Sequence, residues 1–180
     1  MGITGTDVAK GAADMTLTDD NFSTIVTAVK EGRGIYDNIK KAVHFLLSCN
    51  LGEVLAVFIA MLVWGVSPLL PVQLLWLNLV TDGAPALALG MEPVERDVMK
   101  RKPRRKDESV FARGLGVGAI WQGVMFGAIT LVAYALGLHY GGDNHIYANT
   151  MAFCVLAFSQ IVHAWEVRSS HSVFRTKFNP

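Results

Sequence analysis

Four long apolar runs constrain this chain more than any other feature of its sequence. They cover approximately residues 42–66, 71–91, 115–138 and 148–167. A helix needs about 20 apolar residues to cross the ~30 Å hydrocarbon layer of a bilayer. Charged residues make up only 17% of the chain, and 52% of its residues are hydrophobic. The sequence therefore predicts an all-α membrane protein built on a four-helix transmembrane bundle.

The positions of the basic residues predict how the four runs are oriented in the membrane. All 16 Lys and Arg precede the first run, lie between the second and third, or follow the fourth. Cytoplasmic loops are the ones enriched in Lys and Arg, so this pattern predicts that both termini and the 92–113 loop are cytoplasmic. The basic cluster 101–106 is interpreted as part of that topology, with membrane lipid and not nucleic acid as the partner. The compact character of the chain favours the plasma membrane of a prokaryote.

The first forty residues differ from the rest because they contain no long apolar run. Residues 14–18 alternate polar and apolar, as a short strand would. Residues 19–21 offer N-cap side chains for a helix whose apolar face begins at Phe22, and Gly32 and Gly34 are expected to break or bend it. The segment is too short to bury a core of its own, so it is interpreted as an α/β remnant of a larger domain.

Polar side chains interrupt the first two apolar runs. Asn50 and Glu53 are three residues apart and share a helix face, and Asn78, Thr81 and Asp82 share another. A carboxylate at the centre of a span costs about 2.5–3.5 kcal/mol on insertion scales, so such residues usually face the protein interior and mark an ion path. The turn between the two runs is short, so the two helices are antiparallel neighbours whose polar faces can meet.

Gly83 and Pro85 favour a discontinuity in the second of these helices. Proline has no N–H, so the carbonyl of Thr81 lacks its helical partner and becomes available to a cation. Carboxylates, amide oxygens, a hydroxyl and free carbonyls form the all-oxygen ligand set that calcium favours. The alternative is that these groups hydrogen-bond to one another and hold the bundle together. That alternative explains Glu53 and Asp82 poorly, because a neutral amide would do the same at lower cost.

The fourth run contains two further polar residues near its end. Two interpretations of Gln160 stay open: it forms a hydrogen bond that packs the bundle, or it is an ion ligand. His163, one turn later, is interpreted as a residue of a helix interface.

Three stretches resemble P-type calcium-transporting ATPases. Residues 71–93 (PVQLLWLNLVTDGAPALALGMEP) look like the sixth membrane helix of that family, and residues 48–54 (SCNLGEV) look like its fifth. Residues 19–43 resemble the end of its phosphorylation domain and the stalk into the fifth helix. The resemblance implies two parts: residues 1–40, the end of the cytoplasmic, haloacid-dehalogenase-like phosphorylation domain with its stalk, and residues 41–180, the C-terminal transmembrane domain.

The resemblance also implies roles for six candidate metal ligands. Five match calcium ligands of the fifth and sixth helices, namely Asn50, Glu53, Asn78, Thr81 and Asp82. Gln160 aligns with a glutamate ligand of two-site calcium pumps, at a position where sodium pumps have glutamine. One complete ion site is therefore expected, and a second is left open.

Much of the family's machinery has no counterpart in this sequence. The D-K-T-G, T-G-E-S and G-D-G-x-N-D motifs, the nucleotide domain and the fourth membrane helix are missing. The chain is thus expected to be the C-terminal portion of a pump whose N-terminal portion binds ATP and Mg²⁺, with no catalytic residue of its own. The implied function is ATP-driven calcium transport. The alternatives are a pump for sodium, potassium, protons or manganese, and a stand-alone membrane module without catalysis.

Overall fold

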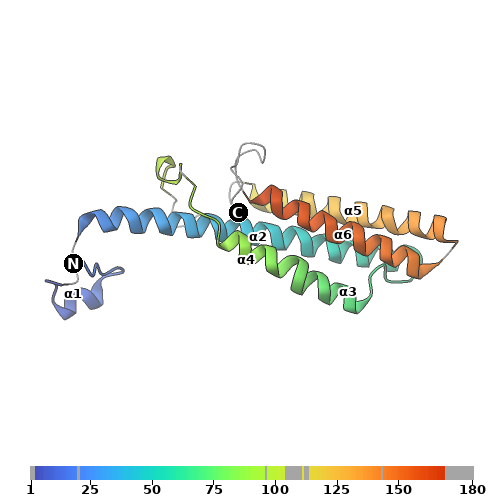
Figure 1. The fold of residues 1–180 in the computed structure, drawn as a ribbon, viewed down its shortest axis with the longest axis horizontal. Coiled ribbons are helices and arrows are strands. Elements are labelled where there is room, and N and C mark those ends of the chain that lie inside the picture. The colour runs from blue at the N-terminus through green and yellow to red at the C-terminus, as the bar shows by residue number, and fades with distance from the viewer. Residues whose placement is uncertain are drawn as a thin grey trace. The chain divides into compact units, whose positions relative to one another are not determined.

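The computed structural model describes residues 3–19, 21–95, 97–103, 111, 114–142 and 144–168. Several residues of the sequence interpretation, namely Asp20, residues 104–106, Arg113, Arg175 and Lys177, lie outside these ranges. The described elements, in chain order, are α1 (Asp7–Ala12), α2 (Phe22–Trp64), α3 (Pro71–Trp76), the π-helix η1 (Leu77–Asp82), α4 (Gly83–Gly90), the 3₁₀ turn η2 (Val98–Lys100), α5 (Leu115–Gly141) and α6 (His145–Val167) (Figure 1).

The prediction of four membrane-capable helices is confirmed. Four helical stretches are long and apolar enough to cross a membrane: Phe22–Trp64, Pro71–Gly90, Leu115–Gly141 and His145–Val167. The predicted α/β remnant is wrong, because the described residues contain helices and no strand. Residues 14–18 form bends and irregular backbone, since an alternating segment becomes a strand only where another strand pairs with it.

The helix α2 begins at an Asn cap and does not break where two glycines predicted that it would. Asn21 Oδ1 accepts a hydrogen bond from Ser23 N at 3.0 Å, which confirms N-cap chemistry in this segment. The helix then continues through Gly32 and Gly34 to Trp64. A helical glycine costs only about 1 kcal/mol relative to alanine, which tertiary packing can offset. A Cβ at Gly34 would lie 2.4 Å from Val94 Cγ2, so glycine is required here for close packing and not for a bend.

The described chain divides into two compact units, Met1–Asp37 with Pro93–Arg104, and Asn38–Glu92 with Arg105–Pro180. In the first unit, arginines fasten the segment after α4 to the early turns of α2. Arg33 Nη1 donates to the carbonyls of Val98 and Arg101, at 3.1 and 3.0 Å. Arg101 in turn forms ion pairs with three carboxylates, those of Asp37, Glu95 and Asp97.

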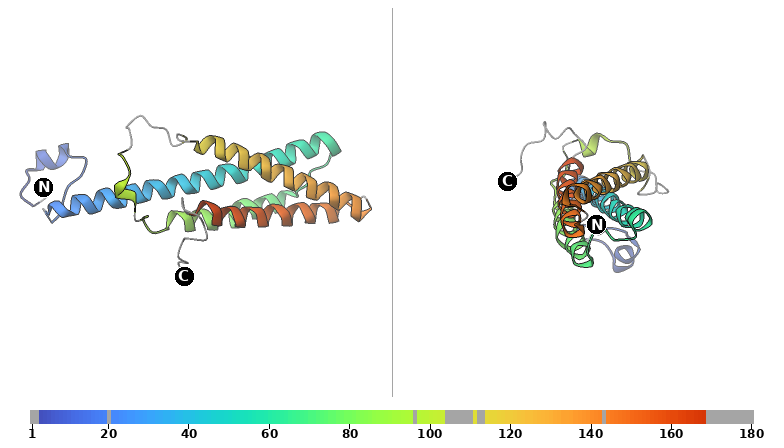
Figure 2. Two further views of the ribbon diagram at one scale, coloured as in Figure 1. Left: turned by 90° about the horizontal axis from the view of Figure 1, so that it is seen from above. Right: turned by 90° about the vertical axis from the view of Figure 1, so that its right-hand side faces the viewer.

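The second unit contains the helical bundle. Helices α5 and α6 pack as an antiparallel pair, joined by a turn in which Gly142 has a φ of 61° and Asn144 caps α6. In the view from above in Figure 2, α5 crosses the later part of α2. A Cβ at Gly52 of α2 would lie 3.2 Å from the Gly123 carbonyl of α5, so small residues allow these two helices to approach closely.

Two groups of buried apolar side chains fill the bundle on either side of its polar centre. The larger group gathers Leu77 of η1, Phe126 and Tyr134 of α5, and Leu156 of α6. The smaller group contains Phe45 and Cys49 of α2 with Leu89 of α4. These contacts hold α2, η1, α4 and α6 around the buried carboxylates described next.

Candidate cation site

Glu53 is the centre of a polar cluster built by three helices. Its side chain lies within the bundle, and the residue is only 5% exposed. Gln160 of α6 donates from Nε2 to Glu53 Oε1 at 2.9 Å, and Asn78 of η1 donates from Nδ2 to Glu53 Oε2 at 2.8 Å. The polar faces of the first two spans therefore meet, and the fourth span joins them.

Asp82 is the second carboxylate of this cluster. It is fully buried beside the thiol of Cys49, close enough to Glu53 for their charges to interact. Among the described residues the Cys49 thiol, a weak donor, is the side chain that interacts with the Asp82 carboxylate, and no N–H donates to Asp82 Oδ1 or Oδ2; Gln160 Oε1 is buried without a partner. Burying a carboxylate without a partner is costly, and coordination to a metal ion is one of the few arrangements that offset this cost. The three free oxygens thus fit a hard cation.

The π-helix η1 carries Asn78, Thr81 and Asp82. Its six residues separate α3 from α4, and the amide of Gly83 at its end donates to the Val80 carbonyl. An α-helix here would need the N–H that Pro85 lacks, to pair with the Thr81 carbonyl. The predicted discontinuity therefore takes the form of a wider helical turn and not of an unwound break. Single π-turns within helices occur often at functional sites.

The structure places the six predicted ligands unequally. Glu53, Asp82 and Gln160 lie together in the interior, Thr81 is buried beside them, and Asn78 reaches Glu53 from a more exposed position. Asn50 is not brought into this cluster. It is exposed, and its amide donates to the Leu46 carbonyl of its own helix at 2.8 Å.

A second polar layer, which the sequence did not reveal, surrounds His163. This residue is 1% exposed, and its ring stacks on Phe45 and meets the edges of Phe126 and His44. Its Nδ1 lies 3.3 Å from Glu166 Oε2. The interpretation of His163 as an interface residue is confirmed. No periodicity within one span could have identified these partners, because they come from three helices.

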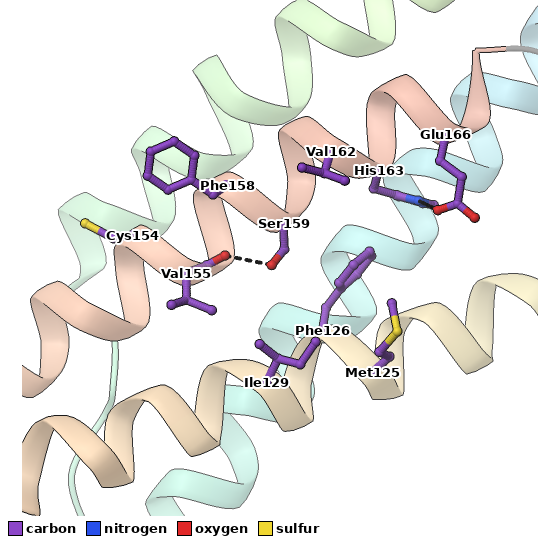
Figure 3. A pocket seen from close by; sticks show the side chains of 10 residues that line it. All are labelled: Met125, Phe126, Ile129, Cys154, Val155, Phe158, Ser159, Val162, His163 and Glu166. Atoms are coloured by element: carbon purple, nitrogen blue, oxygen red, sulfur yellow. Dashed lines mark hydrogen bonds and ion pairs between the residues drawn. The ribbon is translucent and has the colours of Figure 1, made fainter. Parts of the chain in front are cut away.

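Next to this layer is an apolar groove between α5 and α6, with a volume of about 470 Å³. Figure 3 shows the side chains that line it, which include Met125, Phe126 and Ile129 of α5 and Val155, Ser159 and Val162 of α6. His163 and Glu166 lie at one end of it. The groove is separate from the buried carboxylates Glu53 and Asp82, because no residue of their cluster lines it.

Comparison with known proteins identifies the family. Residues 66–180 match the model of the family described as "Cation transporting ATPase, C-terminus". The chain belongs to this family and, with its four membrane-capable helices, is an integral membrane protein.

Several curated relatives are similar over almost the whole chain. It is 52% identical over 174 residues to a calcium-transporting ATPase of Bacillus subtilis, covering 97% of this chain and 20% of the relative. It is 51% identical over 190 residues to calcium-transporting ATPase 1 of Bacillus cereus, covering 97% of the chain and 21% of the relative. An endoplasmic reticulum-type calcium-transporting ATPase of Arabidopsis thaliana is 41% identical over 97% of the chain and 16% of its own length. The chain thus spans about one fifth of the bacterial relatives.

Proposed function

We propose that this chain is the cation-binding, C-terminal membrane part of an ATP-driven calcium pump. The observation that carries the proposal is the pair of buried carboxylates, Glu53 and Asp82, the second of which has only the weakly donating Cys49 thiol beside it among the described residues. Calcium takes six to eight oxygen ligands in irregular geometry, which suits carboxylates, amides and a hydroxyl presented by separate helices. The relatives' printed names, calcium-transporting ATPases, agree with this cargo.

The ligand set that we propose is Asn50, Glu53, Asn78, Thr81, Asp82 and Gln160. Asn50 and Asn78 are both exposed on the described chain, as are Val54 and Leu79 next to them in the sequence. Apolar residues with amides among them suit a face that a further transmembrane segment covers. We assign that segment to the N-terminal portion of the same pump, which would complete the coordination of the ion.

The proposed mechanism connects this site to ATP through α2. Residues 1–40 are assigned to the end of the phosphorylation domain and its stalk, and residues 41–180 to the transmembrane domain. ATP and Mg²⁺ would bind the remainder of the longer protein. The stalk through residues 35–43 would couple phosphorylation to a rearrangement of the ion ligands, two of which, Asn50 and Glu53, lie further along α2. Alternation between two states would then open the site to either side of the membrane.

The proposed topology follows from the basic residues. Both termini and the 92–113 loop would be cytoplasmic, and the membrane would be the plasma membrane of a prokaryote. Accessibility of single cysteines introduced at Lys100 and at Gly142 to an impermeant thiol reagent would test this in whole cells. Labelling of a cysteine at position 100 from outside would contradict the orientation.

The substitution Asp82→Asn tests the site in the full-length protein. It keeps the shape of the side chain and removes its charge, so calcium-dependent phosphorylation by ATP should be lost. Phosphorylation by inorganic phosphate in the absence of calcium should persist and would show that the variant is folded. Asp14→Asn, at an exposed position of the first unit, is the matched control and should behave as the wild type. Retained calcium activation in Asp82→Asn would refute the assignment.

A second candidate is a pump for another cation. Gln160 favours this candidate. Its amide donates to Glu53, and the resemblance aligns it with a position where two-site calcium pumps have a glutamate and sodium pumps have a glutamine. ATPase activity measured with calcium, sodium, potassium and manganese, each across pH, separates the two. Activation by calcium alone at micromolar concentration supports the first proposal.

A further inference from the structure

Glu92, just beyond α4, joins the ends of α4 and α6 to the middle of α2. Asn38 of α2 donates from Nδ2 to the Glu92 carbonyl at 2.6 Å and to the Gly90 carbonyl at 3.4 Å. The side chain of Glu92 accepts a hydrogen bond from Arg168 Nε, at the end of α6. Asn38 is 6% exposed, and the side chains of Arg168 and Glu92 are 21% and 18% exposed. These three residues, called the Glu92 latch below, are thus largely shielded from water.

Two residues of the latch follow buried oxygens of the cation site along the chain, one after η1 and α4 and one at the end of α6. Glu92 follows Asp82 by ten residues, and Arg168 follows Gln160 by eight. An apolar groove of about 450 Å³ lies between α4 and α6, lined by Ala84, Pro85 and Ala88 on one side and reaching Glu92 and Arg168. Beside it, Leu89 of α4 belongs to the same apolar cluster as Ala164 and Val167 of α6, so the two helices touch through a few small side chains. The latch is the polar connection that closes the groove at the far end.

The near end of α4 is joined to η1, which is not a regular α-helix. A π-turn followed by Pro85 lacks the uniform hydrogen-bond ladder that makes a helix stiff, and such points are where helices bend. The direction of α4 relative to η1, which carries Asp82, then depends on the packing of Leu89 against Phe45 and Cys49 and on what holds the far end of α4. Arg168 is itself held in place, because its guanidinium lies 5.9 Å from the centre of the Trp165 ring.

We propose that the Glu92 latch positions the cation site: it fixes α4 against α6 and α2, and so sets the distance of Asp82 from Glu53 and Gln160. Glu92 and Arg168 are positioning residues, which act through their helices and not as ligands. Pre-organising ligands in their bound arrangement raises affinity, because less order has to be created on binding. Loss of the latch should therefore weaken cation affinity while leaving the phosphorylation chemistry intact. This inference rests on the proposed function.

Charge removal and charge exchange in the full-length protein test it. The variants are Glu92→Gln, Arg168→Gln and the double exchange Glu92→Arg with Arg168→Glu. Each single variant should need about three to ten times more calcium for half-maximal phosphorylation by ATP, the size typical of coupling through packed elements. The maximal phosphoenzyme level should stay unchanged. The exchange should restore the wild-type calcium dependence to within about twofold, since the Asn38 bonds go to backbone carbonyls and survive it.

Lys100→Gln is the matched control, because it removes an exposed charge from the same loop and should change nothing. An unchanged calcium dependence in both single variants would overturn the proposal, as would a double exchange that behaves like the single variants. If the single variants do not accumulate, Arg168→Lys is measured instead, with a shift of about twofold expected and no shift counting against the latch. If the wild type responds to a cation other than calcium, the proposed function fails, and the same shifts measured with that cation decide on the latch.

Discussion

Gln160 Nε2 lies 2.9 Å from Glu53 Oε1 and donates a hydrogen bond to it, although 107 residues separate the two in the chain. Because the amide nitrogen faces Glu53, the amide oxygen is free, and it is buried without a partner. One side chain thus orients a carboxylate and also offers an oxygen of its own. In the proposed calcium site, this arrangement would let a glutamine serve where the family resemblance implies a glutamate.

Gln160→Leu should weaken calcium binding because it removes both functions at similar volume. A hydrogen bond to a charged group contributes about 1.5–3 kcal/mol, so the expected loss is about tenfold to 100-fold. The measurement is the calcium concentration for half-maximal phosphorylation by ATP. The control is Ser159→Ala on the same helix, whose hydroxyl bonds only to the Val155 carbonyl behind it. Wild-type affinity in Gln160→Leu would show that this residue only fills space.

Pro85→Ala tests whether the π-helical turn matters for the ion. Alanine supplies the missing N–H, so an α-helical hydrogen bond to the Thr81 carbonyl becomes possible and η1 can revert to an α-helix. Removing a proline from a helix interior relieves a cost of about 3 kcal/mol, so the unfolding temperature should stay the same or rise. Calcium affinity should nevertheless fall, because the side chains of η1 change their direction.

Two measurements on one sample check this prediction, thermal unfolding in detergent and calcium-dependent phosphorylation. Pro71→Ala is the control, since Pro71 occupies the first turn of α3, where proline replaces no hydrogen bond. A Pro85→Ala protein with unchanged calcium affinity would mean that η1 has no part in ligation.

The sequence predicted what local composition determines. The number of membrane-capable helices, the short turn between the first two of them and the turn near Asn144 depend on residues close together in the chain, and the structure confirms them. The meeting of Glu53 with Asn78 could also be predicted, because neighbouring antiparallel helices bring their polar faces together. The outward position of Asn50 could not. Residues three apart on a helix point about 60° apart, so one can be buried while the other lies at the edge.

Contacts between distant segments account for the remaining differences. The local sequence predicts that Gly34 breaks the helix, whereas the structure shows that it makes room for Val94, a residue distant in the chain. The alternation of polar and apolar residues at 14–18 predicts a strand. A strand forms only where a second segment pairs with it, and the alternation does not show whether such a segment exists. The same holds for the second polar layer, where His163 is surrounded by His44, Phe45 and Phe126 from two other helices. The sequence around one polar residue of an apolar span does not identify the residues of other helices that it contacts.

Gly52→Ala should destabilise the bundle. Its Cβ would lie 2.9 Å from Phe126 Cβ and 3.2 Å from the Gly123 carbonyl, neither of which can move without shifting α5. Overpacking of this kind costs about 1–3 kcal/mol. Gly32→Ala in the same helix is the control, because its Cβ would meet nothing within 4 Å, and it should stabilise α2 by up to about 1 kcal/mol. Unfolding in mixed detergent gives both values, and equal effects of the two substitutions would contradict the close α2–α5 packing.

The ion pair between Arg101 and Asp97 is expected to depend on pH. Its hydrogen bond to the carboxylate lowers the pKa of Asp97 below the ordinary value of 3.8. A group whose folded-state pKa is depressed stabilises the fold above its unfolded pKa, and this contribution is lost as the pH falls through the folded-state value. The Arg101–Asp97 pair should therefore persist at neutral pH and be lost only below about pH 4.

Carboxyl carbon NMR of the chain in lipid nanodiscs can follow this titration. Arg101→Gln should return the pKa of Asp97 towards its ordinary value, because the donor that favours the charged form is gone. Lys100→Gln should leave it in place, since that exposed ammonium group interacts with Asp97 only through screening solvent. If Asp97 titrates identically in the wild type and in Arg101→Gln, Arg101 is held by Asp37 and Glu95 alone, and the loop after α4 is attached to α2 without Asp97.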